Sequence, residues 1–245
     1  ARSGVGLVTV GVPAPLIGVI AAVLDEPMTL PLPSTEAESV AALAVDPALS
    51  FAADKDAVVL GPGLSQHPET RTFVRDFVRR CGVPMLIDAD GLNNLTGCPE
   101  ILRHPAGAPR VVTPHPGEMA RLAVCSTRDV QTDREGIAAR FAAAHGCVVV
   151  LKGHGTIVAD ASGRVLVNTT GNPGMATGGS GDVLSGLIGG LMAQRMEAFD
   201  AAVLGVYLHG LAGDIAAERM TQRGLIAGDI VWALCDAWRA VEEGG

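Results

Sequence analysis

Aromatic side chains and clusters of positive charge are both scarce in this sequence. Phe, Trp and Tyr make up only 3% of the 245 residues, and the 18 Lys and Arg residues form no cluster and are outnumbered by 26 acidic residues. Nucleic-acid-binding proteins need a basic surface and aromatic platforms for the bases. Composition therefore argues against a nucleic-acid partner. An anionic ligand would have to be held locally, by backbone amides, a single lysine or a metal ion.

Cysteine and histidine also lack any metal-binding pattern. The five cysteines contain no C-x-x-C pair, and the six histidines show no ligand spacing, which argues against zinc. The cysteine count is odd, and Cys147 opens the apolar run Val148–Leu151. These features predict reduced, structural thiols in a cytoplasmic protein.

Long uninterrupted apolar runs are missing as well. Hydrophobic residues make up 48% of the sequence, but Gly and Pro break them into short segments, so we expect no membrane-spanning helix and no membrane partner. A chain of 245 residues is long enough for one large α/β domain with a well-buried core.

Short β-branched runs alternate with helical patterns through most of the chain, which predicts an α/β fold with a mainly parallel sheet covered on both faces. The chain opens on a pattern typical of a helix end, a glycine turn and a strand, so we expect an element to be missing upstream. Expected strands are residues 28–32, 56–60, 84–88, 110–113, 147–152, 156–159 and 164–168. Expected helices are residues 15–24, 36–49, 68–80, 118–124, 131 or 132 to 145, 183–193, 199–219 and 228 or 229 to 241.

One glycine-dense stretch, residues 172–186, stands out. Its Gly178-Gly179-Ser180-Gly181 turn leads into an apolar helix pattern, and such a turn can aim several backbone N–H groups, with the positive helix end, at a phosphate. Asp182 follows that turn. It could cap the helix, or it could accept a proton from a hydroxyl that attacks the phosphate. We favour the second interpretation because of the loops that accompany it.

Three further loops are expected at the carboxyl ends of strands, where open α/β sheets bind ligands. These loops are Gly61-Pro62-Gly63-Leu64, Thr113-Pro114-His115-Pro116-Gly117-Glu118 and Lys152-Gly153-His154-Gly155-Thr156. Each has an alternative explanation, namely a tight turn, a structural histidine and a hairpin. Asp88 and Asp90 also end a strand, but they could equally cap the next helix. Because the loops would share one rim with Asp182, we predict a single active site.

The second and third of these loops, together with Asn-Pro-Gly-Met-Ala-Thr-Gly-Gly-Ser-Gly-Asp at residues 172–182, resemble the ADP/ATP-dependent NAD(P)H-hydrate dehydratases of the ribokinase-like superfamily. The resemblance implies a ribokinase-like three-layer α/β/α sandwich with a mainly parallel central sheet. It implies a single domain over residues 1–245 that lacks its first strand, its glycine-rich loop and most of its first helix. It also implies a homo-oligomer, a tetramer or larger.

The implied activity is dehydration of the S-form of NAD(P)H hydrate, driven by ADP or ATP with Mg²⁺, which regenerates NADH or NADPH and releases phosphate. Asp182 would be the catalytic base and would contact the hydrate, together with Gly63 and His115. Glu118 would hold Mg²⁺ through water. The resemblance assigns nucleotide binding to Lys152, Gly153, His154, Gly155, Thr156, Gly179, Ser180 and Gly181.

Two other functions are compatible with parts of this pattern. A ribokinase-like kinase for a sugar, hydroxymethylpyrimidine or hydroxyethylthiazole would share the glycine turn and Asp182, but would usually lack the Pro114–Glu118 motif and the Asn172 lead-in. A nucleotide-binding sensor without turnover would share the fold. The presence of Asp182 argues against a sensor.

Overall fold

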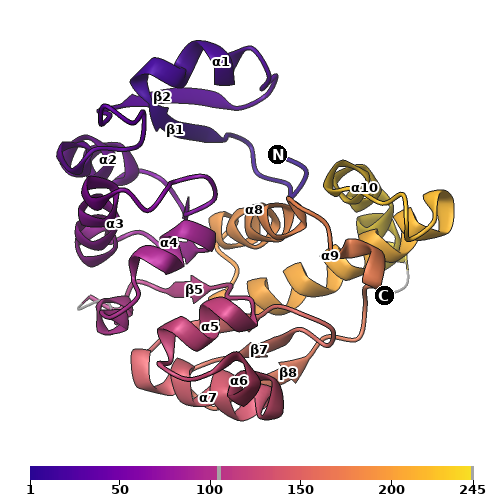
Figure 1. Ribbon diagram of the computed structural model, residues 1–245. Helices are drawn as coiled ribbons and strands as arrows, with labels where there is room; N and C mark the ends of the chain where they lie inside the picture. Colours follow the sequence, from indigo (N-terminus) through magenta and orange to yellow (C-terminus); the bar gives the residue numbers. More distant parts are fainter. Residues whose placement is uncertain (104–105, 244–245) are drawn as a thin grey trace.

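The computed structural model describes residues 1–103 and 106–243, and its elements follow the expected alternation (Figure 1). Residues 104–105 and 244–245 of the expected domain lie outside the described residues. The strands are β1 (Thr9–Pro13), β2 (Met28–Leu32), β3 (Val58–Leu60), β4 (Met85–Ile87), β5 (Arg110–Val112), β6 (Val148–Leu151), β7 (Ile157–Ala159) and β8 (Val165–Val167).

The α-helices are α1 (Ile17–Ala21), α2 (Val45–Ala52), α3 (Pro68–Arg80), α4 (Ala89–Asn94), α5 (Pro116–Leu122), α6 (Thr127–Thr132), α7 (Arg134–His145), α8 (Ser180–Ala193), α9 (Ala198–Met220) and α10 (Ala227–Glu243). Short 3-10 helices cover Ala14–Leu16, Ala42–Ala44, Pro99–Leu102 and Pro173–Met175.

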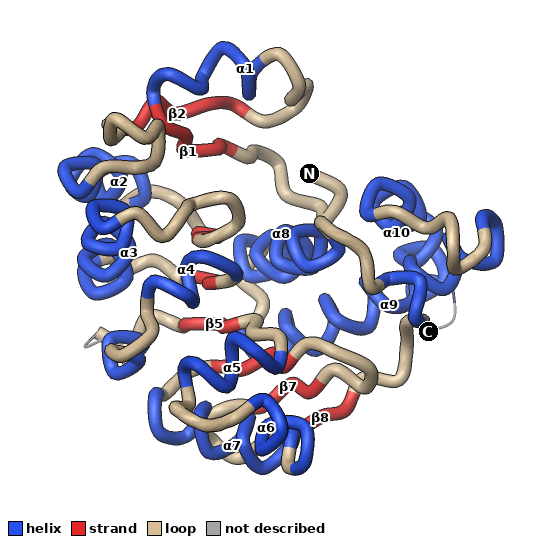
Figure 2. Tube along the Cα trace, viewed as in Figure 1, coloured by secondary structure: helices blue, strands red, loops and turns tan. Residues whose placement is uncertain are grey.

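The strands form two sheets rather than one (Figure 2). The larger sheet has the order β3-β4-β5-β6-β7-β8, in which β3 to β6 are parallel and β7 and β8 are antiparallel additions. The smaller sheet is the parallel pair β1-β2. The expected mainly parallel α/β architecture is therefore confirmed.

The larger sheet is the middle of three layers, as the alternation of side chains along β4 shows. Met85 and Ile87 face a core built with α2, α3, α5 and α7, whereas Leu86 faces a core built with α8 and α9. Helix α9 is long and apolar enough to span a membrane by composition alone. However, 61% of its apolar window is buried, and it packs on α8, α10 and the sheet, so it is a core helix.

The helix expected over residues 36–49 is wrong over its first six residues. Residues 35–41 form an irregular loop, and the chain becomes helical only at Ala42–Ala44 and α2. The hydroxyls of Thr35 and Ser39 bond each other at 2.9 Å, the Thr35 amide donates to the Ser39 carbonyl, and Glu38 has φ of 54°. Local hydroxyl bonding of this kind competes with the helix.

The helix expected from residue 131 or 132 to residue 145 begins only at Arg134, after a separate helix, α6, that ends at Thr132. Asp133 leaves the helical conformation, with φ of −138°, and its carboxylate accepts the amide of Gly136 at the start of α7. An internal Asp therefore acts as an N-cap, which is the common role of this residue type.

Candidate active site

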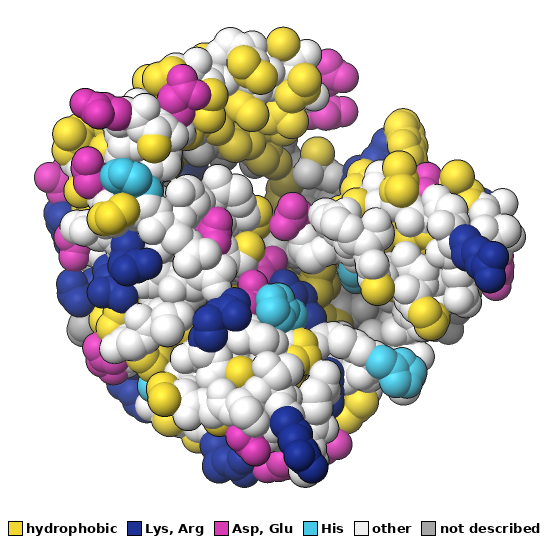
Figure 3. Space-filling model, viewed as in Figure 1, with side chains coloured by type: hydrophobic (Ala, Val, Ile, Leu, Met, Phe, Trp, Pro, Cys, Tyr) yellow, Lys and Arg dark blue, Asp and Glu magenta, His cyan; other side chains and the backbone are white. Residues whose placement is uncertain are grey.

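The predicted loops meet at one edge of the larger sheet, because the parallel strands β3 to β6 all end there. Backbone bonds continue the ladder past the strand ends: Asp88 donates to Leu60, and Lys152 donates to Pro114. In the space-filling view this face is hollowed between the β1–β2 region and the α8–α10 region, and acidic, basic and histidine side chains gather beside the hollow (Figure 3).

A buried ion pair forms the centre of this edge. Lys152 Nζ lies 2.6 Å from Asp88 Oδ1, and the Ser185 hydroxyl on α8 donates to Asp88 Oδ2 at 2.7 Å. Asp88 is only 1% exposed, and the side chain of Lys152 is 20% exposed. Sequence reasoning considered Asp88 too ambiguous to include among the site residues and did not identify Ser185. In the structure Asp88 pairs with the ammonium of Lys152, and Ser185 holds the Asp88 carboxylate.

The amino end of α8 lies directly against this pair. A Cβ placed on Gly181 would lie 3.3 Å from Lys152 Nζ and 3.8 Å from Asp88 Oδ2. Glycine thus keeps the space between the helix end and the ammonium open. The turn before it depends on Gly179, whose φ of 84° is strained for other residues and which occupies the N-cap position.

Asp182 occupies the first turn of α8, and the residue as a whole is exposed to solvent although its carboxyl is partly desolvated. Partial burial and the nearby charge of Asp88 raise the pKa of its carboxyl, against the opposing effect of Lys152. The N-cap of α8 is Gly179, and no side chain caps this helix within the described residues, so the alternative interpretation of Asp182 as a cap finds no support. A carboxylate with a raised pKa beside a lysine and a glycine turn is suited to accept a proton.

His115 and Glu118 form a capping box on α5. Glu118 Oε2 accepts the His115 amide at 2.8 Å, and His115 Nδ1 accepts the Gly117 amide at 3.0 Å. Glu118 is 5% exposed, and its Oε2 lies 4.0 Å from Lys152 Nζ. Lys152 therefore lies between the carboxylates of Asp88 and Glu118. The His115 side chain is 51% exposed, which leaves its ring accessible to a ligand.

The loop of Lys152, Gly153, His154, Gly155 and Thr156 is held by a residue that sequence reasoning missed. Arg134 Nη2 donates to the carbonyls of Leu151, Lys152 and Gly155 at 3.2 to 3.5 Å. The Thr156 hydroxyl also turns inward, to the Gly153 carbonyl at 2.9 Å. His154 is exposed. Since Arg134 fixes the carbonyls, the conformation of the loop is set before any ligand binds.

The remaining predicted residues lie around this centre with different exposure. Gly63 follows β3 in a turn with φ of 74°, and Gly61 in the same turn packs so closely on the Asp88 carbonyl that any Cβ would overlap it. Ser180 is buried, and its hydroxyl contacts His209 Nε2 at 3.4 Å instead of facing the hollow.

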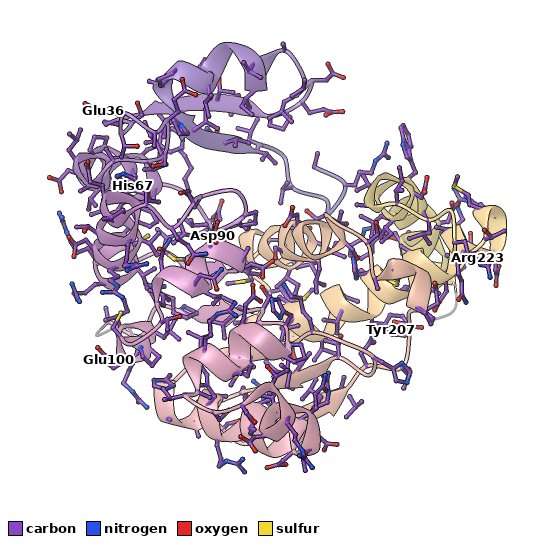
Figure 4. All side chains as sticks on the ribbon, viewed as in Figure 1. Glu36, His67, Asp90, Glu100, Tyr207 and Arg223 are labelled. Atoms are coloured by element: carbon purple, nitrogen blue, oxygen red, sulfur yellow. The ribbon has the colours of Figure 1, made fainter. Side chains whose placement is uncertain are left out.

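Asp90, labelled near the centre of Figure 4, is engaged structurally. Its carboxylate accepts the Ser65 amide and the side chains of Gln66 and Asn93 at 3.0 to 3.1 Å. Asp88 and Asp90, two residues apart, therefore have different environments, and only Asp88 reaches Lys152.

The sequence and the fold are both similar to those of known proteins. A family model described as NAD(P)H-hydrate dehydratase matches residues 1–234. The bifunctional NAD(P)H-hydrate repair enzyme of Moorella thermoacetica is 46% identical over 242 residues, which are 99% of this chain and 46% of that protein. The ADP-dependent (S)-NAD(P)H-hydrate dehydratase of Neisseria meningitidis serogroup B is 41% identical over 180 residues, covering 72% of this chain and 61% of that protein. The chain thus spans about half the length of the bifunctional relative.

The solved structure of the ADP/ATP-dependent NAD(P)H-hydrate dehydratase from Bacillus subtilis, co-crystallised with ATP and Mg²⁺, has a TM-score of 0.79 and 29% identity, covering 97% of this chain and 80% of that one. Hydroxyethylthiazole kinase from Pyrococcus horikoshii has a TM-score of 0.65 at 18% identity over 94% of this chain and 86% of that one, a likeness that extends to the ribokinase-like fold alone.

Proposed function

Because the chain belongs to the NAD(P)H-hydrate dehydratase family, we propose that it dehydrates the S-form of NAD(P)H hydrate with ADP or ATP, and so regenerates NADH or NADPH. The observation that carries this proposal is the position of Asp182 and Gly181 beside the Lys152–Asp88 pair. Relatives named for NAD(P)H-hydrate repair or dehydration are 46% and 41% identical to this chain over 99% and 72% of its length.

The reaction would proceed by phosphoryl transfer followed by elimination. Asp182 accepts the proton of the hydrate's hydroxyl as that oxygen attacks the terminal phosphorus of the nucleotide. The carbon–oxygen bond to the phosphate then breaks, and the neighbouring ring carbon gives up a proton to solvent as the ring double bond re-forms. Inorganic phosphate leaves, so that ADP yields AMP and ATP yields ADP. Lys152 and the amides of Gly179, Ser180 and Gly181 would bind the transferring phosphate, because charge stabilisation and positioning dominate this chemistry.

Gly63 and His115 would bind the hydrate, and Gly153, His154, Gly155 and Thr156 the nucleotide. The half-exposed ring of His115 and the preset loop of residues 152–156 support these roles.

Mg²⁺ fits the residues at this edge. Among the described residues no group of three or more His, Cys, Asp or Glu could hold a metal by itself. Mg²⁺, however, is commonly held by one or two carboxylates together with substrate phosphates, and Glu118 offers such a carboxylate. We propose that Glu118 holds the ion through water. Bound there, Mg²⁺ would neutralise charge on the nucleotide phosphates.

We also propose that the protein acts in the cytoplasm as a homo-oligomer. All five cysteines are free, which suits a reducing compartment. Exposed apolar side chains such as Trp232 and Ile226 on and beside α10 are suited to subunit contacts. Light scattering on the purified protein would measure its mass, and a monomer at all concentrations would contradict the oligomer.

One assay tests the activity. Phosphate release is measured from ADP and from ATP, with and without hydrated NADH, while the absorbance of reduced nicotinamide is followed. We expect phosphate and reduced nicotinamide to appear together, and only when both substrates are present. A stable phosphorylated product without recovered absorbance would instead identify a kinase, and nucleotide binding without phosphate release would identify a sensor.

A further inference from the structure

The stretch that leads into the glycine turn is attached to α9 through Asp214. Asp214 Oδ2 accepts the Gly171 amide at 2.8 Å, and Oδ1 accepts the side-chain Nδ2 of Asn172 at 2.9 Å. The Asn172 carbonyl Oδ1 accepts the Gly174 amide at 3.0 Å. A continuous chain of hydrogen bonds thus runs from the middle of α9 to the short helix Pro173–Met175.

Two glycines on the same face of α9 let the stretch lie directly on the helix. A Cβ on Gly210 would overlap the Thr170 hydroxyl, and a Cβ on Gly213 would overlap the Met175 sulfur. The Thr170 hydroxyl uses this closeness to donate to the Tyr207 carbonyl at 2.9 Å. Residues 170–175 therefore pack against α9 with no space for a side chain between them.

A second attachment point lies at the other end of the stretch, where His209 Nε2 is 3.4 Å from the Ser180 hydroxyl. His209 is 8% exposed, and burial lowers its pKa to about 4, so the ring is neutral near neutral pH. Ser180 is followed by Gly181, the residue in contact with Lys152. The contact from α9 thus fixes the backbone beside the ammonium.

We propose that Asp214 and His209 are positioning residues, which hold residues 171–180 in the conformation that binds the nucleotide phosphate. This inference rests on the proposed function, since it assumes that the turn receives a phosphate. A glycine-rich stretch loses much conformational entropy when it becomes ordered. Because residues 171–180 are already held against a core helix, this entropy is not lost when the ligand binds. Preorganisation of this kind raises affinity.

Two variants test the contact between Asp214 and Asn172. The first is Asp214→Asn alone, and the second exchanges the two side chains in the double variant Asn172→Asp with Asp214→Asn. In Asp214→Asn, one carboxylate oxygen becomes an NH₂ group that faces the donor Nδ2 of Asn172. If Asn172 turns its amide to compensate, its NH₂ group instead faces the Gly174 amide, so one donor always stays unsatisfied. In the double variant Asn172→Asp with Asp214→Asn, the amide introduced on α9 donates to the carboxylate introduced in the loop, which also accepts the Gly174 amide. Every hydrogen bond is then restored, and the negative charge lies at residue 172 instead of residue 214.

Asp160→Asn provides a matched control. Asp160 follows β7 at the opposite edge of the sheet, and it also accepts backbone amides, those of Ser162 and Arg164, at 2.9 to 3.0 Å. Like Asp214, it accepts backbone amides and receives the same substitution, but it also pairs with Arg164 Nε at 2.6 Å and lies outside the proposed site. We expect it to lower the melting temperature and to leave ADP affinity unchanged.

Two measurements need no hydrate: ADP affinity by calorimetry, and hydrogen exchange of the amides of residues 171–181. We expect Asp214→Asn to weaken ADP binding on the order of 10-fold and to speed exchange in this segment, and the double variant to restore both. Wild-type ADP affinity and exchange in Asp214→Asn would overturn the proposal, as would a folded double variant that restores neither.

Measuring phosphate release in the presence of hydrate distinguishes a failure of this inference from a failure of the proposed function. We expect Asp214→Asn to lower kcat/KM by a larger factor than it weakens ADP binding, because a misplaced turn also misplaces the transferring phosphate. A wild-type protein that binds ADP but releases no phosphate would overturn the proposed function. The positioning role would still be decided by ADP affinity and exchange.

Discussion

The ammonium of Lys152 lies 2.6 Å from the carboxylate of Asp88, although 64 residues of sequence separate them. Asp88 is 1% exposed and lies at the end of β4, while Lys152 follows β6. In the free protein the carboxylate balances the lysine's charge and fixes its direction. A nucleotide phosphate would therefore meet an ammonium that is already in place.

Replacing Lys152 should separate stability from nucleotide binding. Lys152→Ala leaves the buried Asp88 carboxylate unpaired, and removing one partner of a buried pair costs about 3–5 kcal/mol. In the double variant Lys152→Ala with Asp88→Asn, we expect most of the free energy of unfolding to return, while ADP affinity stays low. Urea unfolding and calorimetry measure the two quantities. Wild-type ADP affinity in either variant would remove Lys152 from the site.

Asp182→Asn should abolish turnover without abolishing binding. Loss of a general base lowers rates by about 10²- to 10⁴-fold, and we expect that loss in hydrate-dependent phosphate release, with ADP affinity near that of the wild type. Asp229→Asn is the control, because Asp229 also occupies the first turn of a helix, α10, and its carboxylate accepts the Ile226 amide. Equal activity in the two variants would contradict a base role for Asp182.

The pH dependence of kcat/KM should also report on Asp182. A base must be deprotonated, so activity falls as the pH drops through its pKa, and partial burial and Asp88 raise that pKa above 3.8. Asp88→Asn removes the second of these causes, so we expect the acid limb of the profile to move to lower pH. An acid limb that stays in place would show that another group controls it.

Arg134→Lys should weaken nucleotide binding without any direct contact to the ligand. A lysine cannot reproduce the guanidinium contacts to the three loop carbonyls of Leu151, Lys152 and Gly155, so we expect ADP affinity to fall on the order of 10-fold. Arg103→Lys is matched to it, because Arg103 Nη2 donates to the Ala143 and Ala144 carbonyls near the end of α7. That control should bind ADP like the wild type.

Local patterns were sufficient to predict most elements of the fold. The helix Pro68–Arg80 was predicted to the residue, because a proline start, an apolar stripe and the basic pair Arg79-Arg80 agree. The helix prediction failed over residues 36–41, where the hydroxyls of Thr35 and Ser39 bond locally. Such a bond depends on the backbone conformation, which the apolar spacing does not reveal.

The sequence was sufficient to predict the loops of the site, but not the residues that hold those loops in place. Glycine turns at strand ends mark where a ligand could bind, and the structure brings Lys152, Gly181 and Glu118 together. Asp88, Arg134 and Asp214 act through contacts with distant segments, and nothing near them in the sequence distinguishes them from ordinary capping or surface residues. Tertiary packing alone selects which acid or base is buried beside the site.

Burial of His209 should make the protein sensitive to acid. Its pKa is about 4 in the folded state against 6.5 when exposed, so the unfolded chain binds an additional proton between these values. The neutral His209 ring makes its full contribution to the free energy of unfolding above pH 6.5. That contribution, about 3 kcal/mol, is lost as the pH falls from 6.5 towards 4.

His209→Gln removes this titration while keeping a side chain that can bond Ser180. We expect its free energy of unfolding, measured by urea titration, to be lower than that of the wild type at pH 8, because Gln packs less well at a buried imidazole site. The difference should narrow as the pH falls, since only the wild type loses the stability of a neutral ring. A constant difference between the two proteins from pH 8 to pH 4 would show that His209 already titrates normally in the folded state.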